Sequence, residues 1–152
     1  MAITVEIELP DPDAETVISR ADLTFSGLDH SGPSYEVRVY FNTPDAGPDS
    51  ACTSAAGFVA RFAVFGHGGC FGEEGHCELT EPVSAFDRTH PPQLVPATRV
   101  LEVTAAIKAL VERHDSNVQV TLVPVVRGSV LASPEQAEDV LVLDQIALHI
   151  FD

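Results

Sequence analysis

Basic residues are scarce in this chain. Its 152 residues include 23 acidic and only 8 basic side chains, which gives a formal net charge of −15, and Lys108 is the only lysine. Such an acidic surface repels the phosphates of nucleic acids and the headgroups of anionic membranes. We therefore expect neither nucleic acid nor a membrane as a partner. The acidic surface is expected to favour solubility, and the alternative is that it attracts cations or a basic patch on a partner.

Long apolar runs are also missing. No stretch approaches the roughly 20 apolar residues needed to cross a bilayer. The first ten residues, MAITVEIELP, have neither the basic region nor the apolar region of a secretory signal. The sequence thus predicts a cytoplasmic protein. Its length and its 45% hydrophobic content predict a single folded domain over residues 1–152.

Cysteine is sparse as well, and the three residues Cys52, Cys70 and Cys77 cannot all pair within one chain. An odd number of cysteines in a reducing compartment favours thiols or metal ligands over a disulfide framework. The sequence also lacks a phosphate-binding loop, a nucleophile elbow and a dinucleotide-binding motif. We therefore predict that the chain is not an enzyme.

What the sequence does contain is the periodicity of β-strands. Apolar residues alternate with polar ones from Ile3 to Leu9, as in a strand with one buried face. Further strands are predicted at residues 18–25, 35–41, 58–65, 99–103, 117–126 and 140–151. About seven strands favour an all-β fold, an antiparallel, jelly-roll-like β-sandwich.

Two segments of this predicted sandwich stand out. Residues 58–65, FVARFAVF, are almost continuously apolar, which is typical of a central strand buried on both faces. One short helix is predicted after residues 99–103, because Val103, Ile107 and Leu110 fall on one helical face. Thr104 is its predicted N-cap.

The predicted strand at residues 58–65 leads into an unusual segment, GHGGCFGEEGHC, at residues 66–77. His67, Cys70, His76 and Cys77 lie in it with the spacing H-x2-C-x5-H-C. Neutral imidazole and thiolate are the ligands that Cu(I) and Zn(II) prefer. Its glycines would let the backbone turn sharply enough to bring four side chains together. These four residues are the predicted metal ligands.

Other interpretations of the segment stay open. Cys70 and Cys77 could form a small disulfide, or both could be buried thiols. Glu73, Glu74 and Glu78 are predicted to form a solvated rim. Cys52 is predicted to be a structural thiol that could join the cluster as a further sulfur ligand. No metal-binding role is predicted for the scattered histidines, which are His30, His90, His114 and His149.

Several motifs, in this order, resemble a β-sandwich domain that follows the copper domain in tyrosinase-like proteins and molluscan haemocyanins. The motifs are Ala56-Gly57-Phe58, the glycine- and cysteine-containing segment 66–77, Phe86-Asp87-Arg88 and residues 99–110. The segment SGPSYEVRVYFNTPDA, residues 31–46, resembles the matching part of bacterial tyrosinase-type proteins. The resemblance covers roughly residues 20–152, and it implies the same β-sandwich that the periodicity predicts.

In that family the oxidase chemistry belongs to a helical domain whose histidines bind a pair of copper ions, and no such domain is present in this sequence. The resemblance therefore implies a non-catalytic accessory domain. Such a domain would bind copper, preferably Cu(I), and deliver it to a tyrosinase-like type 3 copper enzyme, or shield the active site of that enzyme. The spacing of Cys70 and Cys77 departs from the Cys-x-x-Cys pattern linked with copper loading in some tyrosinases. Two alternatives stay open, namely a metal-free interaction domain with a Cys70–Cys77 disulfide and a structural zinc site.

Overall fold

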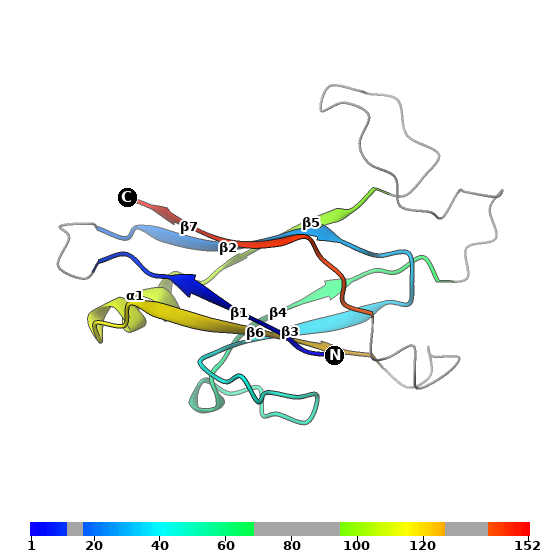
Figure 1. Ribbon diagram of the computed structural model, residues 1–152, viewed down its shortest axis with the longest axis horizontal. Coiled ribbons are helices and arrows are strands. Elements are labelled where there is room, and N and C mark those ends of the chain that lie inside the picture. Colours follow the sequence, from blue (N-terminus) through cyan, green and yellow to red (C-terminus); the bar gives the residue numbers. More distant parts are fainter. Residues whose placement is uncertain (12–16, 69–94, 127–139) are drawn as a thin grey trace, which may run out of the picture.

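The described residues fold as two antiparallel β-sheets that pack face to face, with one α-helix at one end (Figure 1). The computed structural model describes residues 1–11, 17–68, 95–126 and 140–152. In chain order the elements are β1 (Ile3–Glu8), β2 (Arg20–Leu28), β3 (Tyr35–Phe41), the 3₁₀ helix η1 (Ser54–Ala56), β4 (Phe58–Val64), β5 (Ala97–Glu102), α1 (Thr104–Glu112), β6 (Asn117–Val125) and β7 (Gln145–Phe151). The predicted antiparallel β-sandwich of about seven strands with one short helix is confirmed.

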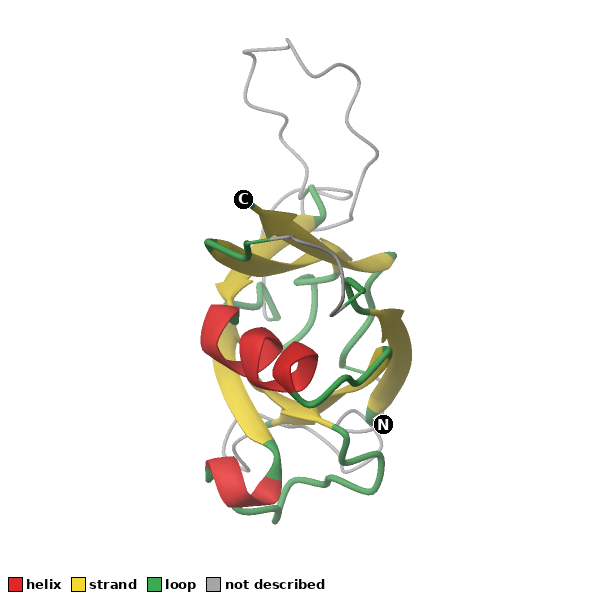
Figure 2. Cartoon of the chain, turned by 90° about the vertical axis from the view of Figure 1, so that its left-hand side faces the viewer, coloured by secondary structure: helices red, strands yellow, loops and turns green. Residues whose placement is uncertain are grey.

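One sheet has the strand order β1-β6-β3-β4 and the other has the order β5-β2-β7. Figure 2 shows the two sheets as opposed, twisted layers, with α1 lying across the opening between them. The inward-facing residues of both sheets form the core, and Leu23, Phe25, Val37, Val39 and Leu122 are among its fully buried members. Because side chains alternate between the faces of a strand, the same strands send polar residues outward.

The prediction that residues 58–65 form a central strand buried on both faces is wrong. Among the described residues β4 pairs only with β3, so it lies at the edge of its sheet. Phe62 and Val64 point into the core, whereas Arg61, Ala63 and Phe65 are exposed. The sequence suggested a buried strand because two of its outward positions, Ala63 and Phe65, are apolar.

The N-cap prediction at the helix is also wrong. Residue Val103 occupies the N-cap position of α1 and makes no side-chain capping hydrogen bond. The Thr104 hydroxyl instead accepts a hydrogen bond from the Ala21 backbone N–H at 3.0 Å and donates one to Glu102 Oε1 at 3.1 Å. The hydroxyl of Thr104 therefore ties the start of the helix to β2. The predicted helical face is confirmed, because Ile107 and Leu110 are buried.

The last strand is shorter than predicted, since β7 begins at Gln145 and residues 140–144 are not part of it. The ladder between β2 and β7 ends at the pair Ser26–Gln145, and on the other edge of β2 the pairing with β5 shifts register between Phe25 and Leu28. Gly27 lies in this irregularity with a φ of 71°, and a Cβ atom there would overlap the Asp144 side chain. The positive φ therefore favours glycine at the point where the regular ladder ends.

Among the described residues, no helix is both long enough and apolar enough to cross a membrane.

Candidate functional site

The segment that contains the predicted metal ligands begins at the end of the sandwich opposite α1 (Figure 1). After β4 the chain runs from Phe65 to Gly68 alongside the connection between β2 and β3. Three hydrogen bonds join the two segments: His67 N–H to the His30 carbonyl at 2.9 Å, Gly68 N–H to the Gly32 carbonyl at 2.7 Å, and Gly66 N–H to Ser34 Oγ at 3.0 Å. Residues 66–68 are therefore held firmly against residues 30–34.

Glycine at position 66 makes this close contact possible. A Cβ atom on Gly66 would overlap the Gly32 carbonyl oxygen and the backbone of Pro33. Any larger residue would push the two segments apart, because the atoms in the way belong to the backbone and cannot rotate aside. Glycine is therefore needed at position 66 for close packing, whether or not the segment binds a metal.

The contact brings two histidine rings together. The ring centres of His30 and His67 lie 5.0 Å apart, with the ring planes at 72°. His67 is exposed and His30 is half-buried. His30 Nε2 lies 2.6 Å from the Val95 carbonyl oxygen, and His67 Nδ1 lies 3.4 Å from the carbonyl oxygen of His30. Since Val95 is the first described residue after the gap at 69–94, His30 contacts the chain on both sides of that gap.

Of the four predicted metal ligands, the structure places His67. Cys70, His76 and Cys77 lie outside the described residues, as do Glu73, Glu74, Glu78, His90 and the Phe86-Asp87-Arg88 motif. Within the described part of the chain, no group of three or more His, Cys, Asp or Glu side chains could hold a metal ion. The metal-site and disulfide predictions for residues 70–77 therefore stay predictions.

The structure adds His30, which the sequence analysis left among the scattered histidines. It precedes His67 by 37 residues, and no local spacing connects the two. A weak signal was available, because both histidines follow predicted strands and lie beside glycines or prolines. Such a signal identifies loops but does not say which loops are neighbours.

The remaining described histidines and cysteine lie apart from this pair. His149 is exposed on β7, and His114 follows α1 with a φ of 60°. Cys52 is exposed, and its sulfur lies 3.9 Å from the Tyr40 hydroxyl on the outer side of the four-stranded sheet.

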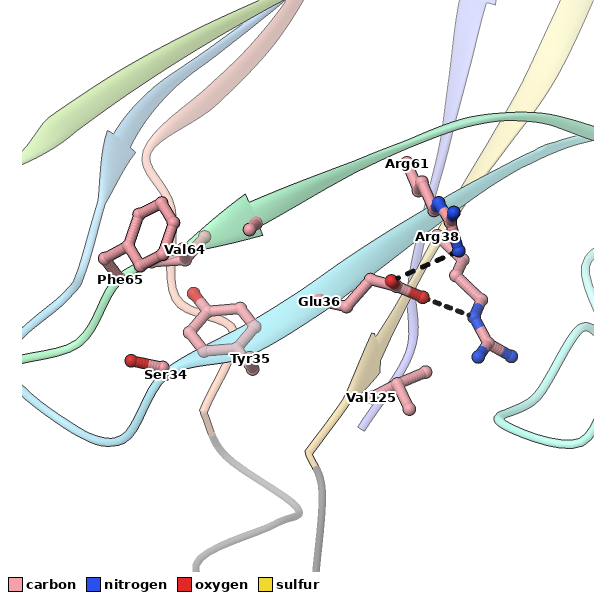
Figure 3. A pocket seen from close by; sticks show the side chains of 9 residues that line it. Ser34, Tyr35, Glu36, Arg38, Arg61, Val64, Phe65 and Val125 are labelled. Atoms are coloured by element: carbon pink, nitrogen blue, oxygen red, sulfur yellow. Dashed lines mark hydrogen bonds and ion pairs between the residues drawn. The ribbon is translucent and has the colours of Figure 1, made fainter. Parts of the chain in front are cut away.

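A groove of about 440 Å³ runs across the outer face of β3 and β4. Figure 3 shows Ser34 and Phe65 at one end of it, and Arg38 and Arg61 at the other. Glu36 forms ion pairs with both arginines, at 2.8 Å to Arg38 Nε and 3.5 Å to Arg61 Nη1. Phe65 is 72% exposed. Because Ser34 and Phe65 adjoin Gly66, the groove ends beside the two histidines.

Tyr35 supports the segment that carries His30. It is buried, and its hydroxyl donates a hydrogen bond to the Asp29 carbonyl at 3.3 Å. The Asp29 side chain in turn accepts hydrogen bonds from the backbone N–H and the hydroxyl of Ser31, both at 2.7 Å. Burial, together with the nearby Asp29 carboxylate, raises the pKa of Tyr35 to about 12. Hydrogen bonds to Asp29 therefore stabilise the backbone on both sides of His30.

Both tyrosines of the folded protein are expected to resist ionisation at pH 10. Burial, assisted by the contact with Cys52, also raises the pKa of Tyr40. The chain has two tyrosines and no tryptophan, so tyrosinate absorbance reports on these residues alone. We expect little tyrosinate at pH 10, where a free tyrosine is about half ionised. Tyrosinate absorbance corresponding to half ionisation at pH 10, in protein that circular dichroism shows to be folded, would contradict this.

The same pKa shift predicts how stability changes with pH. Between about pH 10 and about pH 12 the unfolded chain loses the Tyr35 proton while the folded protein retains it. The free energy of unfolding should therefore fall with rising pH in this range, and the fall should be smaller in Tyr35→Phe. Denaturant titrations of both proteins at several pH values measure the difference.

Comparisons with known proteins agree with the fold. The sequence matches no known family model and no curated protein. The structure is similar to part of a recombinantly expressed latent aurone synthase, a polyphenol oxidase, with a TM-score of 0.56 and 15% sequence identity, covering 99% of this chain and 24% of that chain. Latent aurone synthase from its natural source gives a TM-score of 0.49 at 15% identity, covering 97% of this chain and 24% of the other. The chain thus spans about a quarter of the length of these proteins. The first similarity supports the β-sandwich fold, and it concerns the fold alone.

Proposed function

We propose that this chain is a non-catalytic accessory domain that binds copper and serves a tyrosinase-like type 3 copper enzyme. His67, Cys70, His76 and Cys77 are the proposed ligands, with Cu(I) as the preferred ion. The domain would either deliver copper to the enzyme or shield the active site of the enzyme. A cytoplasmic, reducing location fits the proposal, since the cysteines must be thiols in order to bind the ion.

The observation that carries the proposal is the setting of His67. Its side chain is exposed, its backbone is anchored to His30, and the ring nitrogen Nε2 bonds to no described residue. An imidazole held in this way can bind an ion without a large loss of conformational freedom. His67 lies three residues before Cys70, so a metal bound by both would remain close to the sandwich. Thiolate and imidazole are suitable ligands for Cu(I).

Two further observations support an accessory role. The net charge of −15 raises the local concentration of cations near the surface. The fold is similar to about a quarter of a polyphenol oxidase described as latent, which is the kind of protein that such a domain would serve. The proposal assigns no catalytic residue to this chain.

Anaerobic titration with Cu(I) tests the proposal. The wild-type protein should bind about one copper ion per chain, and the variant Cys70→Ala/Cys77→Ala should lose this binding because it lacks both thiolates. Cys52→Ala serves as the matched control, since it removes the third cysteine and should bind copper as the wild type does. Equal binding by the wild type and the double variant would overturn the assignment of the cysteines.

The groove on the outer face favours a second candidate function, a metal-free domain that docks onto a partner protein. Phe65 is an exposed aromatic anchor, and Arg38 and Arg61 together carry one more positive charge than their shared ion-pair partner Glu36 neutralises. In this case Cys70 and Cys77 would form a disulfide. Intact-mass measurement without reductant separates the candidates, because a disulfide removes two hydrogens and a bound metal adds far more. A structural zinc would be identified by elemental analysis of the purified protein, and its removal would lower the melting temperature.

A further inference from the structure

We infer that His30 is a further imidazole ligand, and that His30 and His67 together form a two-histidine site for a soft or borderline metal ion such as Cu(I). The site lies where residues 30–34 and 66–68 meet, at the end of the sandwich opposite α1. This inference deepens the proposed function and rests on it for the identity of the ion. The inference goes beyond the proposed function because it adds a ligand, His30, from a different part of the chain.

The hydrogen bonds at His30 select one form of its ring. A carbonyl oxygen can only accept a hydrogen bond, so the 2.6 Å contact with the Val95 carbonyl requires a proton on His30 Nε2. In the neutral ring the other nitrogen, Nδ1, then carries a free electron pair. No described residue bonds to that nitrogen. His30 is therefore held in the tautomer that can bind a metal through Nδ1.

The same reasoning applies to His67 with the nitrogens exchanged. Its Nδ1 lies 3.4 Å from the carbonyl oxygen of His30, which leaves Nε2 free for an ion. Histidines that bind metals usually donate their other N–H group to a carbonyl or a carboxylate, which fixes the tautomer and the orientation of the ring. Both rings thus have the supporting contact that a metal ligand needs.

The separation of the rings fits a shared ion. Metal–nitrogen bonds of about 2 Å place the centres of two imidazoles on one tetrahedral ion about 5 Å apart. The observed distance between the ring centres is 5.0 Å. The backbone hydrogen bonds of His67 and Gly68 hold the two segments at this separation without any ion.

The variant His30→Gln tests the inference. The glutamine amide can still donate a hydrogen bond to the Val95 carbonyl, but it lacks the Nδ1 electron pair. We expect Cu(I) affinity, measured anaerobically against a competing chelator, to fall by about tenfold to a hundredfold. His149→Gln is the matched control, because it removes an exposed histidine on β7, where it pairs with Asp22 of β2, and it should bind as the wild type does.

A second measurement does not depend on any variant folding correctly. In ¹⁵N-labelled wild-type protein, Cu(I) should shift the imidazole resonances of His30 Nδ1 and His67 Nε2, and leave those of His149 unchanged. The same shifts should persist in Cys70→Ala/Cys77→Ala at higher copper concentration, because the two rings do not need the cysteines. Unmoved His30 resonances in the wild type would overturn the inference.

These outcomes distinguish the inference from the proposed function. If the cysteine double variant loses copper while His30→Gln binds as the wild type does, the proposed ligand set stands and the role of His30 is wrong. If His30→Gln loses affinity while the cysteine variant does not, the histidine site stands and the cysteine ligands are wrong.

Discussion

Replacing Phe25 by alanine is expected to lower the free energy of unfolding by about 3–5 kcal/mol. Phe25 is fully buried in β2, the middle strand of the three-stranded sheet. Its ring contacts that of Phe62 in the opposite sheet, with a distance of 5.0 Å between the ring centres. The substitution removes the Phe25 ring and leaves a cavity between the two sheets. Because the core is closely packed, the neighbouring side chains cannot move enough to fill that cavity.

Urea or guanidinium unfolding followed by circular dichroism measures this effect. Val100→Ala is a suitable control, because Val100 lies on β5 of the same sheet and is 53% exposed. It should change the free energy of unfolding by about 0.5 kcal/mol or less. If Phe25→Ala were as mild as this control, the contact between Phe25 and Phe62 would not stabilise the packing of the two sheets.

Replacing Gly66 by valine is expected to separate the two segments that bring His30 and His67 together. A side chain at position 66 overlaps the backbone of Gly32 and Pro33, so the segments must move apart. Forcing extra atoms into such a contact costs about 1–3 kcal/mol. The larger effect should be on the site, where copper affinity should fall by about tenfold or more as the two rings lose their fixed separation.

Gly47→Val is the matched control for this substitution. Gly47 lies in the loop between β3 and η1, its φ is not positive, and a Cβ atom there would meet nothing within 4 Å. This variant should keep both the stability and the copper affinity of the wild type. Nuclear Overhauser contacts between the His30 and His67 rings should disappear in Gly66→Val and persist in Gly47→Val. Their persistence in Gly66→Val would show that the segments accommodate the side chain.

The candidate site was only partly predictable. His67 and the cysteines were found because they are close together in the sequence, and their residue types are those of metal ligands. His30 was missed because it belongs to a different loop. The two loops become neighbours only because β3 pairs with β4, which places Tyr35 opposite Val64. Beyond that pair, the backbones of residues 30–34 and 66–68 run side by side.

Local sequence patterns were enough to predict the class of fold and most of the strands. Alternation of apolar and polar residues decides which face of a strand is buried, and this information is local, as at Ile3, Val5 and Ile7. Long-range packing, in contrast, places β4 at the edge of its sheet, exposes Phe65 and brings His30 next to His67. The order of strands in a sheet depends on contacts between residues far apart in the chain, and no local pattern records them.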